Sequence, residues 1–463
     1  MTVARTEATG RGELDPRILA FTTSLPVDQA LYAADIAGSL AHVRMLEDCQ
    51  ILDSPDAQAI RRGLVSIYEE ATSGSYPWPQ EEDIHMAVES ELRRRIGEPA
   101  ARLHTARSRN DQIALDARLF LREQCAPLLE RLGAALEVLI ARARGPEGQW
   151  LLPAFTHRQR AQPITVAYLL SAYGQMLARD GRRFLEVLDA LDECPLGVGA
   201  ISGTSLRTDR GRTAKYLQFS RVTANGLDTV GDRDFALDFT YACARALMHL
   251  SRVSTDLVDF SSQEFGFVKL DDSISFGSSM MPQKKNPDVF ELLRGKSSRA
   301  LGHLTALFAT LKGLPVGYMR DLQEDKSYIE TAALALDCLG AFAIGLTGVR
   351  FVRERMEAAL ADGMTLATDM AEQMVAGGTA FRDAYRAVGA RVQEALARGV
   401  PLTETAGGGG FTARAAVDAK AVQGGTAPAS TDAQLAALEE TARALRARAA
   451  QVPRLKGLLE ALR

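Results

Sequence analysis

Two long stretches of this chain contain no proline: residues 196–281 and residues 316–400. Proline inside a helix removes a backbone hydrogen bond and clashes with the preceding turn, so most helices are interrupted where it occurs. The chain is rich in Ala, Leu, Arg and Glu, which are strong helix formers. We therefore expect helices well above the usual length.

Apolar residues recur at the spacing of packed helices. Between Phe239 and Phe260 they stand at positions 239, 243, 247, 250, 253, 257 and 260, an average step of 3.5 residues. A similar series runs from Val166 to Leu191. This step is typical of helices in a bundle or coiled coil, and alternating strand patterns are scarce. The sequence predicts a mainly α fold.

Helices of this length present apolar stripes that a single chain has few neighbours to cover. Association of several chains through a shared helical bundle is the simplest remedy. We predict an N-terminal helical domain over residues 1–105, a central long-helix bundle over 106–350 and a C-terminal helical domain over 351–463. The first boundary lies within the polar segment Arg102–Gln112, and the second marks a change to shorter amphipathic helices near Arg350.

Charge and cysteine content indicate which partners and which cellular compartment to expect. The 463 residues carry a formal net charge of −4, which predicts no binding to nucleic acid or to a membrane surface. Five scattered cysteines without a Cys-x-x-Cys pair favour a reducing compartment. Met1–Leu14 is polar and unlike a secretory signal, and the apolar run Ala332–Val349 is broken by Asp337. We expect a soluble, cytoplasmic protein in which that run is a buried bundle helix.

The most informative segment is Gly277-Ser278-Ser279-Met280-Met281-Pro282-Gln283-Lys284-Lys285-Asn286-Pro287-Asp288. Small hydroxyl residues follow a glycine, and two lysines precede a predicted helix with Asn286 as its N-cap and Pro287 at its first position. Lysine charge and free N–H groups at a helix start both favour anions. An isolated Gly-Ser-Ser or Lys-Lys would indicate only a solvated loop, but the whole string does not.

This string resembles the signature of the fumarase/aspartase superfamily, in its argininosuccinate lyase branch. Four other segments look like the same branch in the same order: Glu82–His85, His104–Gln112, Asp232–Phe235 and Asp321–Lys326. The similarity runs from about Thr22 to Gln434. It implies a three-domain fold with a long central helical bundle shared in a homotetramer. It also implies a carbon–nitrogen lyase that splits argininosuccinate reversibly into arginine and fumarate, without metal or organic cofactor.

The resemblance also implies the catalytic groups. Ser278 is the base, acting as an alkoxide that Lys284 and neighbouring loop N–H groups stabilise. His157, within the segment Phe155–Pro163, is the acid side and is oriented by Glu291. An elimination next to a carboxylate needs such a base, donors for the developing charge and an acid for the leaving nitrogen.

The substrate-binding residues that the resemblance implies come from several segments. Arg107 and Arg109 offer guanidinium forks suited to carboxylates, although a charged loop or helix start is the plainer interpretation. The full set is Ser24, Asp28, Asp83, Arg107, Ser108, Arg109, Asn110, Thr156, Asn286, Tyr318, Arg320, Gln323 and Lys326.

We expect the other histidines and one glycine-rich segment to have structural roles. We interpret His42, His249 and His303 as structural or solvent-facing, and His85 and His104 as possible supports of the site. None of the six histidines has zinc-ligand spacing. The segment Gly197–Gly203 has the wrong spacing for a nucleotide loop and is interpreted as a turn.

Three departures from the family pattern bear on the substrate. A Trp-Gly-Gly-Arg-Phe segment is missing near the start, Arg158 stands where leucine is common, and Met319 replaces a frequent asparagine. They motivate an alternative, a related lyase that releases fumarate from another N-substituted aspartate. A third hypothesis is a non-enzymatic structural protein of the same fold, against which Ser278, His157, Lys284 and Glu291 together argue.

Overall fold

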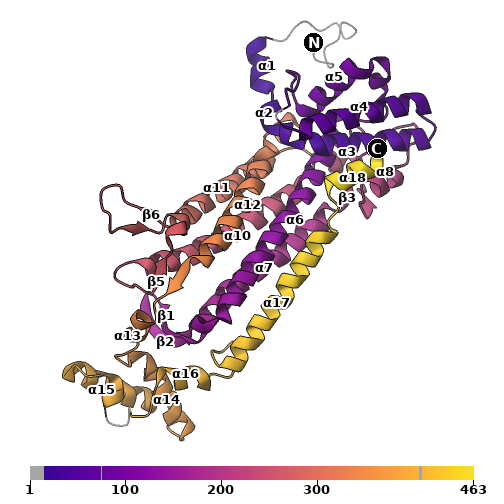
Figure 1. The fold of residues 1–463 in the computed structure, drawn as a ribbon. Coiled ribbons are helices and arrows are strands. Elements are labelled where there is room, and N and C mark those ends of the chain that lie inside the picture. The colour runs from indigo at the N-terminus through magenta and orange to yellow at the C-terminus, as the bar shows by residue number, and fades with distance from the viewer. Residues whose placement is uncertain (1–14, 75, 406–408) are drawn as a thin grey trace.

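The computed structural model describes residues 15–74, 76–405 and 409–463. Its longest helices lie side by side in an elongated bundle (Figure 1). They are α6 (Arg109–Ala143), α7 (Val166–Leu191), α10 (Asp234–Ser261), α11 (Asp288–Leu311), α12 (Ser327–Thr347) and α17 (Pro428–Gln451). The mainly α fold is therefore confirmed.

The predicted helix series match two of these helices. The apolar positions 239–260 all lie in α10, and the series from Val166 to Leu191 coincides with α7. Phe184 and Phe239 meet edge to face between the two helices, with ring centroids 6.2 Å apart. In α6 the helix continues through Pro127, because packing on α7, α12 and α17 outweighs the local cost of that residue.

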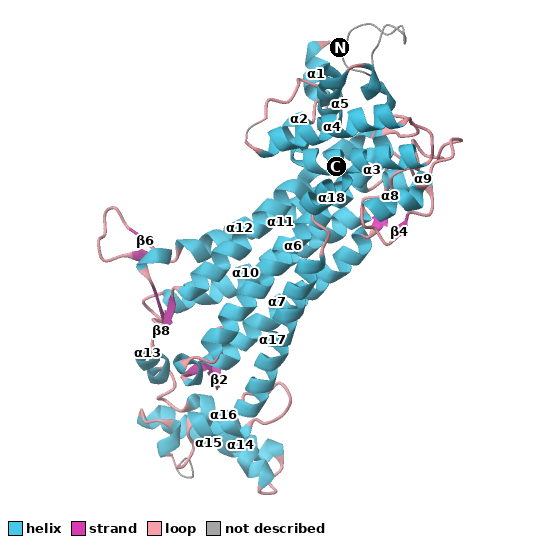
Figure 2. Ribbon diagram, turned by 45° about the vertical axis from the view of Figure 1, so that its right-hand side comes forward, coloured by secondary structure: helices cyan, strands magenta, loops and turns pink. Residues whose placement is uncertain are grey.

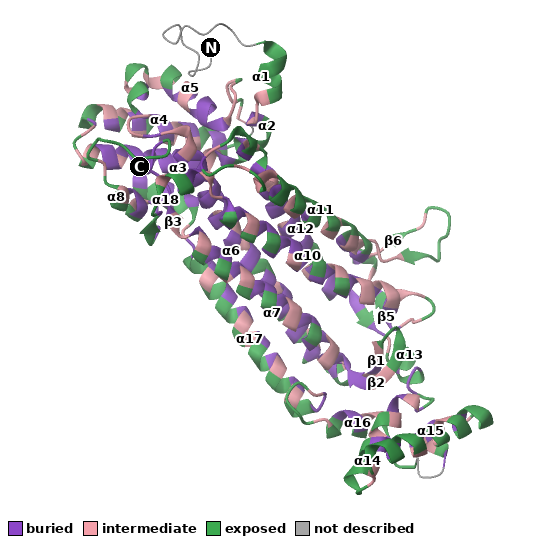
Figure 3. Ribbon diagram, turned by 180° about the vertical axis from the view of Figure 1, so that it is seen from behind, coloured by how far each residue is buried: buried purple, intermediate pink, exposed green. Residues whose placement is uncertain are grey.

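Burial is concentrated where the bundle helices face one another (Figure 3). α12 packs against α6, α10 and α11, which agrees with the expected buried bundle helix. By length and apolar composition the segment 320–347 resembles a membrane span, and 56% of its most apolar window is buried inside the molecule.

Short helices cover one end of the bundle. They are α1 (Pro16–Thr22), α2 (Leu25–Asp28), α3 (Tyr32–Asp48), α4 (Ser54–Thr72) and α5 (Ile84–Ile96), followed by the 3-10 turn η3 (Glu98–Arg102). The last helix, α18 (Leu455–Leu462), packs on α3. Beside them lie α8 (Arg210–Tyr216), α9 (Gly226–Gly231) and the parallel pair β3 (Glu193–Cys194) and β4 (Arg221–Val222).

The other end carries antiparallel pairs and a group of short helices (Figure 2). The pairs are β1 (Leu151–Thr156) with β2 (Gln159–Thr165) and β5 (Val268–Leu270) with β8 (Val349–Phe351). The helices are α13 (Arg353–Ala358), α14 (Ala367–Ala376), α15 (Phe381–Arg398) and α16 (Ala413–Ala419). On the side of the bundle β6 (Phe276–Gly277) pairs with β7 (Lys285–Asn286) and carries a projecting loop (Figure 1).

Residues 106–350 supply most of the bundle, and α17 returns along α6 and α7 from beyond residue 350. The division of the chain at residues 105 and 350 stays a prediction.

Candidate active site

A cavity of about 520 Å³ lies at the N-terminal end of the bundle. Its walls come from α2, α5, η3, the start of α6 and the 3-10 segment η6 (Arg320–Lys326). The structure brings together here eight of the predicted substrate-binding residues: Ser24, Asp28, Asp83, Arg109, Tyr318, Arg320, Gln323 and Lys326. The volume is in the range of small-molecule sites.

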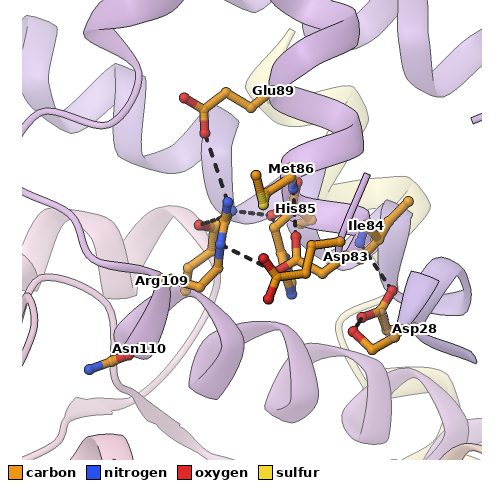
Figure 4. A network of polar contacts seen from close by, with 12 residues as sticks. Asp28, Asp83, Ile84, His85, Met86, Glu89, Arg109 and Asn110 are labelled. Atoms are coloured by element: carbon orange, nitrogen blue, oxygen red, sulfur yellow. Dashed lines mark hydrogen bonds and ion pairs between the residues drawn. The ribbon is translucent and has the colours of Figure 1, made fainter. Parts of the chain in front are cut away.

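One wall is fixed by carboxylates at helix starts. Asp83 is the N-cap of α5 and accepts the Met86 N–H at 2.7 Å. Asp28 accepts the Ile84 N–H at 3.0 Å and the Ser24 hydroxyl at 2.5 Å (Figure 4). Burial raises the pKa of Asp28, although His85 and these hydrogen bonds oppose that shift.

Arg109, the first residue of α6, points toward α5. Its guanidinium lies 3.5 Å from Asp83 Oδ2 and 4.0 Å from Glu89 Oε2, and it donates to Gln112 Oε1 at 2.7 Å (Figure 4). These contacts hold a half-buried cation at the cavity. An anionic substrate group could bind the guanidinium bidentately there.

The opposite wall is built by η6. Arg320 and Gln323 donate to the Thr22 carbonyl at 3.1 Å and 2.9 Å, which ties η6 to α1. Lys326 is buried, and its ammonium donates to Asp325 at 2.7 Å. Asp325 is itself paired with the fully buried Arg233. Since one carboxylate lies between two cations, this buried group carries a net positive charge beside the cavity.

A buried ionic cluster lies behind the cavity. His85 Nδ1 is 3.1 Å from Asp35 Oδ1 and 3.0 Å from Asp116 Oδ2, and all three residues are buried. Burial alone would lower the pKa of His85, but the two carboxylates raise it to about 10. Burial and the charge of Asp35 raise the pKa of Asp116 to about 7.

This cluster is also the one group of described residues with ligand atoms close enough, within 4.8 Å of one another, to hold a metal ion. Gln112 donates a hydrogen bond to Asp35. Burial alone would raise the pKa of Asp35, but the hydrogen bond and charge of His85 lower it, as does the positive charge of the Arg107 guanidinium. The arrangement fits an imidazolium held between two carboxylates. It supports the interpretation of His85 as a support of the site, and the absence of a metal stays a prediction.

Several cavity residues were not in the predicted set. Met86, Glu89, Ser90 and Arg93 line the cavity from α5. They follow Glu82 and Asp83 at steps of three and four residues, so the helical spacing of this segment could have revealed them.

Three of the predicted binding residues beside Arg109 do not line the cavity. Arg107 is buried and donates to Ser39 at 2.9 Å. Ser108 is the N-cap of α6 in a capping box with Asp111. The Asn110 amide donates to the Ala200 carbonyl at 3.1 Å.

Ser278 lies in the loop between β6 and β7. Its hydroxyl oxygen accepts the backbone N–H groups of Met280 at 3.2 Å and of Met281 at 3.0 Å. Lys284 is exposed in the same loop, and Asn286 pairs with Phe276 in the short sheet.

The predicted helix start is wrong by one residue. α11 begins at Asp288 with Pro287 as its N-cap. The pairing with β6 holds the backbone of Asn286 in a strand, so its side chain does not cap the helix. Glu291 lies in the first turn and is exposed, 3.9 Å from Arg294.

Thr156 and His157 lie at the tip of the β1–β2 hairpin, and both are exposed. Within the chain, no hydrogen bond or ion pair joins His157 to Glu291 in the part that the structure describes.

The three groups of predicted site residues lie far apart in one chain (Figure 1). The cavity is at the start of α6, whereas the hairpin follows its end, and 35 residues of helix span about 52 Å. The Ser278 loop precedes α11 and the cavity wall η6 follows it, and 24 residues span about 36 Å. A single chain therefore does not bring Ser278 and His157 to the cavity.

Comparison with known proteins assigns the family. A family model described as lyase matches residues 9–302, and one described as argininosuccinate lyase C-terminal matches residues 364–407. The argininosuccinate lyase of Synechococcus sp. (strain JA-3-3Ab) is 47% identical over 85% of this chain and 81% of its own length. That of Moorella thermoacetica is 44% identical over 88% and 91%. The chain belongs to the argininosuccinate lyase family.

The fold of this chain is also similar to solved structures of other lyases. EDDS lyase in complex with formate superposes with a TM-score of 0.81 at 26% identity, covering 98% of this chain and 95% of the other. The class II fumarase of Schistosoma mansoni has a TM-score of 0.73 at 18% identity, covering 86% and 89%. The fumarase likeness concerns the fold alone. The predicted fumarase/aspartase-like architecture is confirmed.

Proposed function

We propose that this protein is an argininosuccinate lyase, which cleaves argininosuccinate reversibly to arginine and fumarate. The observation that carries this is the identity of 42–47% to argininosuccinate lyases over most of the chain. The cavity supports it by its mixed charge. Argininosuccinate carries carboxylates, a guanidinium and an ammonium group, and the cavity offers carboxylates of Asp83 and Glu89 beside cations of Arg109 and Lys326.

The reaction removes a proton from the carbon next to a succinate carboxylate and breaks the neighbouring carbon–nitrogen bond. In our proposal Ser278 takes that proton as an alkoxide, and the C–H electron pair becomes the double bond of fumarate. The N–H groups of Met280 and Met281 already point at the Ser278 oxygen and would stabilise its negative charge. Lys284 adds a positive charge, and Asn286 binds a carboxylate.

The leaving guanidine nitrogen needs a proton as the bond breaks. We assign this to His157, oriented by Glu291, with Thr156 holding the substrate. The eight predicted residues in the cavity bind the remaining substrate groups. Arg107, Ser108 and Asn110 are proposed to act from the start of α6, where their present contacts are structural.

A complete site then needs more than one chain. We propose a homotetramer in which the cavity, the Ser278 loop and the His157 hairpin come from different subunits. Large apolar side chains remain exposed along α11, namely Leu292, Leu301 and Phe308. A shared bundle would cover them.

We also propose a cytoplasmic location. All five cysteines are free thiols, and four of them are buried. Unpaired cysteines are typical of a reducing compartment.

A second candidate is a lyase that acts on another N-substituted aspartate. The likeness to EDDS lyase, one variant of which was solved with bound fumarate, favours keeping it. Its identity of 26% is well below that of the argininosuccinate lyases.

The test offers purified protein argininosuccinate, adenylosuccinate and aspartate while fumarate is followed by absorbance. Turnover of argininosuccinate alone supports the proposal. Inactivity on argininosuccinate with fumarate from another adduct supports the second candidate, and no fumarate from any adduct leaves the non-enzymatic hypothesis.

A further inference from the structure

The turn that carries His157 has an uncommon backbone conformation. Thr156 pairs directly with Gln159, so His157 and Arg158 form a two-residue hairpin loop. Their φ angles are 53° and 59°, the left-handed values at both positions of a type I′ turn. Asn-Gly is the usual sequence there, whereas His and Arg each cost about 1–2 kcal/mol in this conformation.

The hairpin below the turn is held from two sides. Phe155 packs against Phe260, Phe265 and Phe267, with ring centroids 6.2, 5.6 and 6.3 Å away. Arg160 donates to the Ala359 carbonyl at 2.9 Å. These contacts fix the strands, but neither of them reaches the two turn residues.

Arg158 supplies the contact at the turn itself. Its guanidinium lies 2.8 Å from Asp259 Oδ2, in the last turn of α10. Burial raises the pKa of Asp256, one turn earlier, and the Tyr173 hydrogen bond and the charges of Arg252 and Arg158 oppose that rise. Asp256 is held in turn by the Tyr173 hydroxyl of α7 at 2.9 Å.

The C-terminal end of α10 favours a positively charged side chain nearby. The C-terminal end of a helix carries partial negative charge, so two carboxylates there repel the helix end and each other. A guanidinium offsets both effects. Because Arg158 is 75% exposed and Asp259 30% exposed, the pair adds only about 1 kcal/mol or less to stability. The main effect of this ion pair is on the orientation of the hairpin tip relative to α10.

We propose that Arg158 is a positioning residue for His157: its ion pair with Asp259 ties the tip of the hairpin to the end of α10 and so restricts the orientation of the neighbouring, exposed imidazole. This inference rests on the proposed role of His157. Arg158 touches no reacting atom and acts through the turn.

The decisive variant is Arg158→Gly. Glycine adopts φ near 59° without strain, so the turn can form while the tether is lost. We expect an unchanged or higher melting temperature, a kcat reduced about fivefold or more and a KM changed less than twofold. A wild-type kcat, or a loss of kcat that accompanies a lower melting temperature, would overturn the proposal.

A charge exchange tests the pair directly. Arg158→Glu should lower kcat more than Arg158→Gly, and the double variant Arg158→Glu/Asp259→Arg should recover most of it. Failure of the exchange to recover kcat would contradict the proposal. The matched control exchanges Arg446 and Glu137, an exposed pair at 2.7 Å between α17 and α6, and should leave kcat unchanged throughout.

His157→Asn separates this proposal from the one on which it rests. Full activity of His157→Asn would remove the proposed role of His157 and with it this inference. An inactive His157→Asn together with a fully active Arg158→Gly would overturn the positioning role alone.

Discussion

The hydroxyl oxygen of Ser278 lies 3.0 Å from the backbone nitrogen of Met281 and accepts its hydrogen bond. The N–H of Met280 donates to the same oxygen at 3.2 Å. A serine oxygen that receives two N–H groups is better prepared to carry negative charge than a free hydroxyl. These two contacts support the proposal that Ser278 is the base.

Replacement of Ser278 by alanine should abolish turnover. A catalytic base contributes about 10²–10⁴-fold, so we expect kcat to fall by at least about 100-fold. Oligomer size by light scattering and the helical circular dichroism should not change, since the loop projects from the bundle. Ser279→Ala, at the exposed neighbouring serine, is the control. Near-wild-type kcat in Ser278→Ala would exclude Ser278 as the base.

His157 and Glu291 should behave as one unit in the assembled enzyme. Each of His157→Asn and Glu291→Gln is expected to lower kcat, and the double variant should lose less than the product of the two effects. Steady-state kinetics of the three variants measures this. Strictly multiplicative losses would show that the two side chains act independently.

Mixing inactive variants tests the shared site. If Ser278 and His157 reach one site from different chains, Ser278→Ala mixed with His157→Asn should regain part of the activity after subunit exchange. Some of the mixed sites then contain both an intact Ser278 and an intact His157. A site built from one chain would always keep one of the two substitutions and could not regain activity. Subunit exchange is verified with differently labelled chains. A monomer in solution, or exchanged mixtures without activity, would overturn the proposal.

The His85 cluster should make stability fall at alkaline pH. The folded-state pKa of about 10 exceeds the ordinary value of 6.5 for histidine, because the carboxylates outweigh burial. The folded protein thus holds the proton more tightly than the unfolded chain. The resulting stabilisation, on the order of a few kcal/mol, is complete below about pH 6.5 and is lost as the pH rises toward 10.

Chemical denaturation between pH 6 and pH 10 measures this effect. His85→Gln should remove most of the decline, since glutamine does not titrate. His42 is the opposing control, because burial lowers its pKa to about 3, so its contribution to stability is lost only as the pH falls below 6.5. An undiminished alkaline decline in His85→Gln would place its origin elsewhere.

The long helices could be predicted because their periodicity is local. The steps between Phe239 and Phe260 contain the whole pattern that α10 uses for packing. The segment Gly197–Gly203 was likewise interpretable as a turn. In the structure the N–H groups of Gly197 and Gly199 donate to Asp111 at 2.9 and 2.8 Å.

The cavity could be predicted only in part. The motif residues Asp83 and Arg109 line the cavity, but Glu89 and Arg93 line it from the helical face of α5 and lie outside the short motifs. The cluster of Asp35, His85 and Asp116 depends on contacts between three separate helices, for which no short pattern exists. The predicted start of α11 is one residue too early because Asn286 pairs with Phe276, ten positions earlier, and such a contact has no short sequence pattern.

The position of α18 against α3 has a consequence for synthesis on the ribosome. The helices that enclose the cavity come from the first third of the chain and from η6, yet the surface of α3 is completed by residues 455–462. Arg463 adds an ion pair to Glu69 of α4 at 2.9 Å. The part of α3 that α18 covers therefore stays uncovered until residues 455–462 have been made, so the N-terminal helices reach their final packing only late in synthesis.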